Sequence, residues 1–75
     1  MTIDATLDAR GLLCPLPVLK ARKRLASLTS GQRLRVLADD PAAIVDFPHF
    51  CQESGHTLDD QSQKDGIQTY VIRKK

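Results

Sequence analysis

The chain has 75 residues, of which 41% are hydrophobic and 27% are charged, and its formal net charge is +2. A chain of this size buries only about 60% of its unfolded surface, so we expect residues 1–75 to form a single domain around one compact core. Trp is absent and the aromatic residues are one Tyr and two Phe. This composition argues against a protein that stacks single-stranded bases on aromatic side chains.

The N-terminal residues 1–4 contain no basic cluster and no apolar run, which argues against a secretory signal. No stretch of the sequence approaches the ~20 apolar residues of a membrane span. We therefore expect a soluble cytoplasmic protein that does not insert into a membrane, and in which Cys14 and Cys51 remain reduced.

Residues 2–7 alternate apolar and polar side chains, which predicts a first β-strand with one buried face. Residues 8–11 then form a loop, in which Gly11 permits a backbone angle that other residues avoid. Such a short loop places Cys14 at the C-terminal edge of the first strand, where α/β proteins usually have their ligands and chemistry.

Two prolines follow the thiol, in the sequence Cys14-Pro15-Leu16-Pro17. A proline disfavours the α region for the residue before it, so we expect the backbone to stay extended through Cys14 and to become helical at Leu16 or Pro17. Proline is tolerated there because the first amides of a helix have no intrahelical acceptor. The two prolines also stiffen the chain beside the sulfur.

Cys14 is the best candidate for the chemistry. A helix N-terminus favours a thiolate, and Arg10 lies four residues upstream, so the sequence predicts that the thiol pKa is lowered from ~8.5 toward neutrality. The alternative is a small apolar residue packed beneath the loop, which is the usual fate of a free cysteine. The rigid start of the helix favours the reactive thiol.

Residues 16–28 predict an amphipathic helix of about three to four turns, which stops at Gly31. Its apolar face consists of Val18, Ala21, Leu25 and Leu28. Its opposite face carries Lys20, Lys23, Arg24 and Ser27. The basic residues of that face begin near Cys14 and are candidates for contacting RNA or the acidic surface of a partner, and the alternative is an ordinary solvated helix face.

Residues 33–38 alternate again and predict a second strand, which a right-handed βαβ connection makes parallel to the first. Asp39-Asp40-Pro41 predicts the start of a second helix, with an aspartate as N-cap and Pro41 at the first helical position. Pro48 interrupts the pattern, so we expect a short turn over 42–47 and a helical piece from Pro48 to about 54, or one helix kinked at Pro48.

Residues 56–63 and 67–73 predict a β-hairpin, because Asp65-Gly66 is a hairpin turn signal and the last segment is rich in β-formers. The expected order is therefore βαβαββ. The fold class is an α/β two-layer sandwich, in which a mixed four-stranded sheet carries both helices on one face.

Four short motifs, spread over nearly the whole chain, resemble those of the TusA/SirA family of small sulfur-carrier proteins. The motifs are Leu7-Asp8-x-Arg10-Gly11-Leu12-x-Cys14-Pro15-x-Pro17, then Asp39-Asp40-Pro41-Ala42 with Asp46-Phe47-Pro48, then Gly55-His56-x-Leu58, and finally Ile72-Arg73-Lys74. Each piece is weak alone, and the combination is specific. Some family members have a glutamate between the two prolines of the first motif, where this chain has Leu16.

The resemblance implies that Cys14 carries sulfur as a persulfide. The motif residues that support it are Asp8, Arg10, Gly11, Pro15 and Pro17. It also implies a cysteine desulfurase or rhodanese-like protein as sulfur donor and a downstream acceptor, in tRNA thiolation or in cofactor or sulfur metabolism. No cofactor is expected, and no general base is evident near Cys14, so partner enzymes would supply the turnover. We expect a monomer.

Other uses of the polar residues are less favoured. His49, Cys51 and His56 have metal-binding side chains, but their spacing matches no compact zinc signature, so we expect no metal site. Cys51 could resolve a disulfide with Cys14, although its helical spacing from Phe47 favours a place in the core.

Two other classes of function remain as alternatives. The layout of sheet and helices also resembles the C-terminal domain of bacterial translation initiation factor 3, which suggests a nucleic-acid or protein-binding module in which Cys14 is not essential. The small net charge and the scarcity of aromatic residues argue against direct nucleic-acid binding. A thiol redox or regulatory protein is the third interpretation, but the chain lacks a Cys-x-x-Cys motif.

Overall fold

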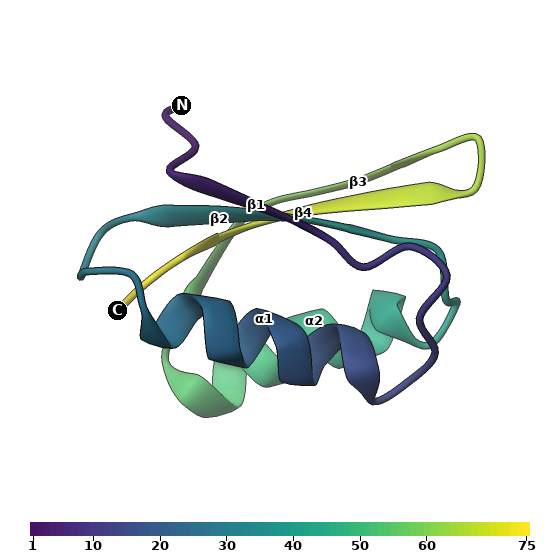
Figure 1. The fold of residues 1–75 in the computed structure, drawn as a ribbon, viewed down its shortest axis with the longest axis horizontal. Coiled ribbons are helices and arrows are strands. Elements are labelled where there is room, and N and C mark those ends of the chain that lie inside the picture. Colours follow the sequence, from purple (N-terminus) through teal and green to yellow (C-terminus); the bar gives the residue numbers. More distant parts are fainter.

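A computed structural model describes residues 1–75. The elements are β1 (Ala5–Asp8), α1 (Leu16–Ala26), β2 (Arg33–Ala38), α2 (Ala43–Ser54), β3 (Thr57–Lys64) and β4 (Ile67–Arg73). Figure 1 shows them in the predicted βαβαββ order. Neither helix has the length and apolar character needed to cross a bilayer.

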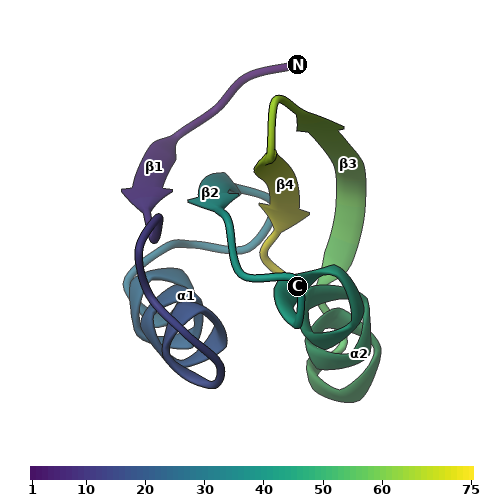
Figure 2. The ribbon, with the colours of Figure 1, turned by 90° about the vertical axis from the view of Figure 1, so that its right-hand side faces the viewer.

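The four strands form one mixed sheet in the order β1-β2-β4-β3. β1 and β2 are parallel, as the right-handed crossover predicts, and the other two neighbouring pairs are antiparallel. Both helices lie against the same face of the sheet, and the other face is not covered by a helix (Figure 2). The predicted two-layer sandwich is confirmed.

The core lies between the helices and the two central strands. Alternate residues of β2, Leu34 and Val36, are fully buried, as the period of a strand requires. The Phe47 ring of α2 stacks on the Tyr70 ring of β4, with ring centroids 4.4 Å apart. Aromatic pairs of this kind contribute more than their buried area alone, so this contact holds α2 to the middle of the sheet.

The hairpin between β3 and β4 turns at Asp65 and Gly66, whose φ angles are 54° and 80°. Two consecutive positive φ angles are what a tight two-residue hairpin requires, and Asp-Gly supplies them at low cost. The predicted hairpin is confirmed.

Several predicted element ends differ from the structure. The first strand begins at Ala5 and not at Thr2, because β2 begins at Arg33: the Asp4 N–H still donates to the Arg33 carbonyl, and residues 1–3 have no partner on β2. β3 spans Thr57–Lys64 and not 56–63. α1 ends at Ala26 and not at Leu28. Its last carbonyl groups accept from side chains, since Ser27 Oγ donates to the Arg24 carbonyl over 2.8 Å.

α2 is one continuous helix through Pro48, so the prediction of a turn followed by a separate piece is wrong. Pro48 has no N–H to donate to the Ile44 carbonyl. That carbonyl instead lies 3.5 Å from the side-chain nitrogen of Gln61 on β3. A long-range donor thus compensates in part for the missing helical hydrogen bond, and Gly55 ends the helix in the left-handed conformation.

We predict that Cys51→Ala lowers the free energy of unfolding by about 1–2 kcal/mol, because Cys51 is only 3% exposed. Burial also raises the pKa of this thiol to about 11. Since the folded-state pKa is raised, the contribution of Cys51 to stability is complete below about pH 8.5. It is lost as the pH rises through about 11.

Urea denaturation of the wild type and of Cys51→Ala at a series of pH values measures both effects. The wild type should lose stability more steeply above about pH 9 than the variant does. Part of the slope will remain in the variant, because burial also raises the pKa of Tyr70, to about 12. Identical slopes would contradict the buried, protonated thiol.

Candidate functional site

Cys14 lies in the turn that leads into α1, and its side chain is exposed. The Leu16 N–H donates to the Leu13 carbonyl over 2.9 Å and closes this turn. Cys14 and Pro15 are therefore the two central residues of a hydrogen-bonded turn, and helical structure begins only after them. The predicted start of the helix at Leu16 is confirmed.

The two prolines have different surroundings. Pro15 caps the helix, and its carbonyl accepts the N–H of Leu19 over 3.1 Å. Pro17 lies in the first turn, where no amide hydrogen is needed, and its ring is buried. Pro17 therefore anchors the start of α1 in the protein interior, while Pro15 stays beside the exposed thiol.

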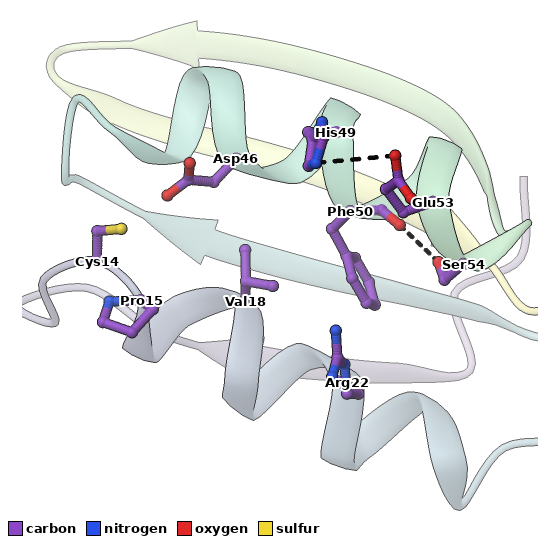
Figure 3. Close-up of a pocket in the computed structure, with 9 residues that line it drawn as sticks. All are labelled: Cys14, Pro15, Val18, Arg22, Asp46, His49, Phe50, Glu53 and Ser54. Carbon is purple, nitrogen blue, oxygen red and sulfur yellow. Dashed lines mark hydrogen bonds and ion pairs between the residues drawn. The ribbon is translucent and has the colours of Figure 1, made fainter.

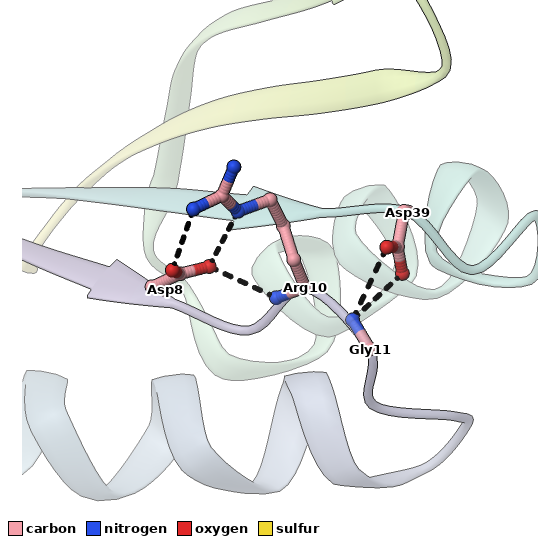
Figure 4. A network of polar contacts seen from close by, with 4 residues as sticks. All are labelled: Asp8, Arg10, Gly11 and Asp39. Atoms are coloured by element: carbon pink, nitrogen blue, oxygen red, sulfur yellow. Dashed lines mark hydrogen bonds and ion pairs between the residues drawn. The ribbon is translucent and has the colours of Figure 1, made fainter.

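Two aspartates after β2 hold the loop that precedes the thiol. Asp40 Oδ2 accepts the Cys14 N–H over 2.6 Å, and its Oδ1 accepts the Ala42 N–H over 3.2 Å. The Asp39 carboxylate accepts the Gly11 N–H at 3.0 and 3.2 Å (Figure 4). The expected aspartate cap lies earlier than the first residue of α2: Ala42, which directly precedes α2, makes no side-chain cap, whereas Asp40 caps the turn that leads into the helix through the Ala42 N–H.

Asp40 is in turn held from the core. The Gln68 side chain, 2% exposed, donates from Nε2 to the Asp40 carbonyl over 2.9 Å. Its Oε1 accepts the hydroxyl of Tyr70 over 2.6 Å. A buried polar chain with its partners satisfied rigidifies its surroundings. The backbone of Cys14 is thus connected through Asp40 to a side-chain network inside the sheet.

Asp8 and Arg10 pair with each other at the end of β1. Arg10 Nε and Nη2 each donate to the Asp8 carboxylate over 2.9 Å (Figure 4). These hydrogen bonds hold the pKa of Asp8 at about 2. The expectation that Arg10 lowers the pKa of Cys14 is wrong, because its guanidinium binds Asp8 and does not act on the thiol.

Cys14 opens onto a cavity of about 360 Å³ between the two helices. Figure 3 shows the side chains around it. Residues of the first helix and its approach line one side and residues of α2 line the other: Cys14, Pro15, Val18 and Arg22, and Asp46, His49, Phe50, Glu53 and Ser54. The cavity therefore brings together residues from two motifs that are distant in the sequence.

The Asp46 carboxylate is directed toward the thiol (Figure 3). The neighbouring Asp46 carboxylate raises the pKa of Cys14, and desolvation and the charge of Asp40 raise it further. The predicted lowering toward neutrality is wrong in direction. The carboxylates of Asp46 and Asp40 near the sulfur each disfavour a second negative charge there.

Arg22 and His49 also belong to this cavity; the sequence analysis did not select Arg22 and considered His49 only as a metal ligand. The Arg22 guanidinium lies over the Phe50 ring, 5.6 Å from its centroid. His49 Nε2 lies 3.9 Å from the Glu53 carboxylate. Helical spacing could have found both residues, since Arg22 is four residues after Val18 on α1 and positions 46, 49, 50 and 53 share one face of α2.

Comparison with known proteins agrees with this arrangement. The sequence model of the family described as Sulfurtransferase TusA matches residues 5–74. The chain belongs to the TusA family. It is 47% identical to the sulfur carrier protein TusA of Pseudomonas entomophila over 72 residues, which cover 96% of this chain and 90% of that protein. It is 42% identical to the sulfur carrier protein TusA of Allochromatium vinosum over 71 residues, which cover 95% and 93%.

A solved structure supports the same membership. The crystal structure of a SirA-like protein from Desulfitobacterium hafniense matches with a TM-score of 0.82 at 31% identity, covering 92% of this chain and 95% of that one. The predicted TusA/SirA family is therefore confirmed. The names of these relatives support a sulfur carrier role for the chain, and such a role implies contact with a sulfur donor and a sulfur acceptor.

The three basic residues of the predicted stripe, Lys20, Lys23 and Arg24, are all exposed on α1. Arg24 Nη2 lies 3.4 Å from the Thr6 carbonyl of β1. Lys20 and Lys23 make no hydrogen bond or ion pair within the chain. They are therefore free to act on another molecule, as a TusA-family carrier would require of a contact surface.

The three residues with metal-binding side chains lie in different places. His49 lines the cavity, Cys51 is in the core, and His56 Nδ1 accepts the Lys75 N–H over 3.1 Å near the C-terminus. No group of three His, Cys, Asp or Glu side chains is placed to hold a metal ion. Cys51 lies in the core. This is the position that its helical spacing from Phe47 favours, and not that of an accessible thiol that could resolve a disulfide with Cys14.

We predict that Asp40→Ala lowers the free energy of unfolding by about 1–3 kcal/mol, because it leaves the Cys14 and Ala42 N–H groups without their acceptor. Amide hydrogen exchange at Cys14 should become faster than in the wild type. The matched control is Asp60→Ala, which removes an exposed carboxylate of β3. Its effect should stay within about 0.5 kcal/mol. Equal stability and exchange in the two variants would contradict the tether.

Proposed function

We propose that this TusA-family chain carries sulfur as a persulfide on Cys14. The observation that carries the proposal is an exposed thiol whose backbone is fixed by Asp40 at the mouth of a cavity. The second cysteine, Cys51, lies in the core. Sulfur delivered by another protein would therefore meet one accessible thiol.

The transfer is an exchange at sulfur. Cys14 sulfur attacks the outer sulfur of a donor persulfide, a new S–S bond forms on Cys14, and the S–S bond of the donor breaks. The donor cysteine leaves as a thiolate, which takes up the proton that the Cys14 thiol has lost, so no external oxidant or reductant is needed. Delivery to the acceptor repeats the exchange in the other direction, with Cys14 as leaving group.

The raised pKa of Cys14 is consistent with a carrier that depends on its partners. The thiolate is the nucleophile, and a raised pKa keeps the resting thiol protonated and slow to react. We infer that the donor, a cysteine desulfurase or a rhodanese-like protein, supplies the reactive persulfide. The acceptors belong to tRNA thiolation or to cofactor or sulfur metabolism.

The surface around the thiol suits contact with other proteins. Exposed large apolar residues lie close in sequence to Cys14 and Asp46: Leu13, Leu16, Leu19 and Val45. We call these four residues the apolar rim. They follow or precede Cys14 on the loop and α1, or directly precede Asp46 on α2. Leu16, which stands between the two prolines, is 44% exposed, so this chain offers a partner an apolar contact beside the thiol.

Loading of sulfur tests the assignment of Cys14. After incubation with a cysteine desulfurase and cysteine, intact mass should increase by roughly 32 Da for one sulfur on the wild type. Cys14→Ser should gain none, because oxygen cannot form the persulfide. Cys51→Ala is the matched control and should load like the wild type. Equal loading of Cys14→Ser would favour the alternative of a binding module in which Cys14 is not essential.

The basic residues are assigned to partner encounter. Lys20→Glu with Lys23→Glu should slow transfer from a loaded donor mainly through association, and the effect should shrink above about 0.15 M salt. Arg35→Glu with Lys64→Glu removes the same charge from exposed positions on the sheet and is the matched control. If both pairs slow transfer equally, net charge and not this face of α1 governs the encounter.

A further inference from the structure

Asp46 is the one carboxylate of the cavity with no other use. It lies in the first turn of α2, is partly buried, and points toward the Cys14 sulfur from the opposite side of the cavity (Figure 3). We propose that the Asp46 carboxylate holds the proton of the resting Cys14 thiol and receives that proton when the sulfur attacks a donor. The second half of this inference rests on the proposed sulfur transfer.

The other charged groups near the thiol are already engaged. From the loop before α2, Asp40 accepts two backbone N–H groups. From α2, His49 and Glu53 lie within 3.9 Å of each other. From α1, Arg22 lies over the Phe50 ring. The side chain of Asp46 makes no hydrogen bond or ion pair with any of these groups, so its oxygens are available to the thiol.

The direction of the pKa shift on Cys14 agrees with this geometry. The Asp46 carboxylate beside the thiol is the largest cause of the raised pKa, ahead of desolvation. An acceptor that is already an anion stabilises S–H and disfavours the thiolate. Susceptibility to oxidation follows thiolate character and exposure. Asp46 would therefore protect an exposed thiol between its encounters with partners.

The proton balance of the transfer step is then complete within the site. As the Cys14 sulfur bonds to the outer sulfur of the donor persulfide, its proton passes to an Asp46 oxygen. The donor S–S bond breaks and its electron pair stays on the donor sulfur, which takes the proton from Asp46. The step yields one persulfide on Cys14, one donor thiol and an Asp46 carboxylate ready for the next exchange.

The pH dependence of Cys14 alkylation tests this role without any sulfur transfer. The rate of modification of the intact protein by iodoacetamide is measured against pH and assigned to Cys14 by peptide mass. Asp46→Asn should move the midpoint of the profile to lower pH, and we expect a shift of about one pH unit. At pH 7 the rate should rise about threefold, because tenfold more thiolate is offset in part by its lower nucleophilicity.

Three further variants define the result. Asp46→Glu should restore the wild-type midpoint more closely than Asp46→Asn. Asp60→Asn removes one exposed negative charge elsewhere and should leave the midpoint unchanged. Glu53→Gln removes a carboxylate from the same cavity and should shift the midpoint less than Asp46→Asn, because Glu53 does not act on the thiol. Circular dichroism confirms that each variant is folded.

An unchanged or raised midpoint in folded Asp46→Asn would overturn the inference, and so would an equal shift in Asp60→Asn or Glu53→Gln. The outcome is separate from that of the proposed function. A wild type that loads sulfur on Cys14 while Asp46→Asn keeps its midpoint retains the carrier and removes the role of Asp46. A shifted midpoint in a protein that loads no sulfur retains the role of Asp46 in holding the thiol proton and removes the carrier function.

Discussion

The hydrogen bonds from the Cys14 loop to Asp39 and Asp40 are the constraint on which the site depends. They connect the segment after β1 to the segment after β2, so that the backbone carrying the thiol cannot move independently of the sheet. Asp40 is itself held by Gln68, and Gln68 by Tyr70. The place of an exposed sulfur is thus set by the packing of the interior.

The elements of the fold were predictable because their signals are local. The alternation of apolar and polar residues in β2 and the Asp65-Gly66 turn signal each extend over only a few residues, and the structure contains both the strand and the turn. The local sequence did not favour a continuous α2, because a proline inside a helix removes one backbone hydrogen bond. Gln61, 17 residues beyond Ile44, lies against the carbonyl that Pro48 leaves free.

The site itself was predictable only in part. Cys14 and the prolines stand together in the sequence, whereas Asp40 acts on Cys14 across 26 residues and Asp39 on Gly11 across 28. Read locally, those aspartates resemble a helix cap. The predicted direction of the pKa shift at Cys14 was wrong for the same reason. The helix N-terminus and Arg10 are near in sequence, but the carboxylate that faces the sulfur comes from another helix.

A thiol that carries sulfur, the role we propose for Cys14, has two conflicting requirements, exposure to partners and resistance to side reactions. The apolar rim and the open cavity meet the first, and an anionic neighbour that favours S–H meets the second. The two are compatible because moving the proton from Cys14 to Asp46 leaves the pair with one negative charge throughout. When a docked partner excludes water, one negative charge is buried whether the proton is on Cys14 or on Asp46. Moving the proton between them therefore does not bury a second charge.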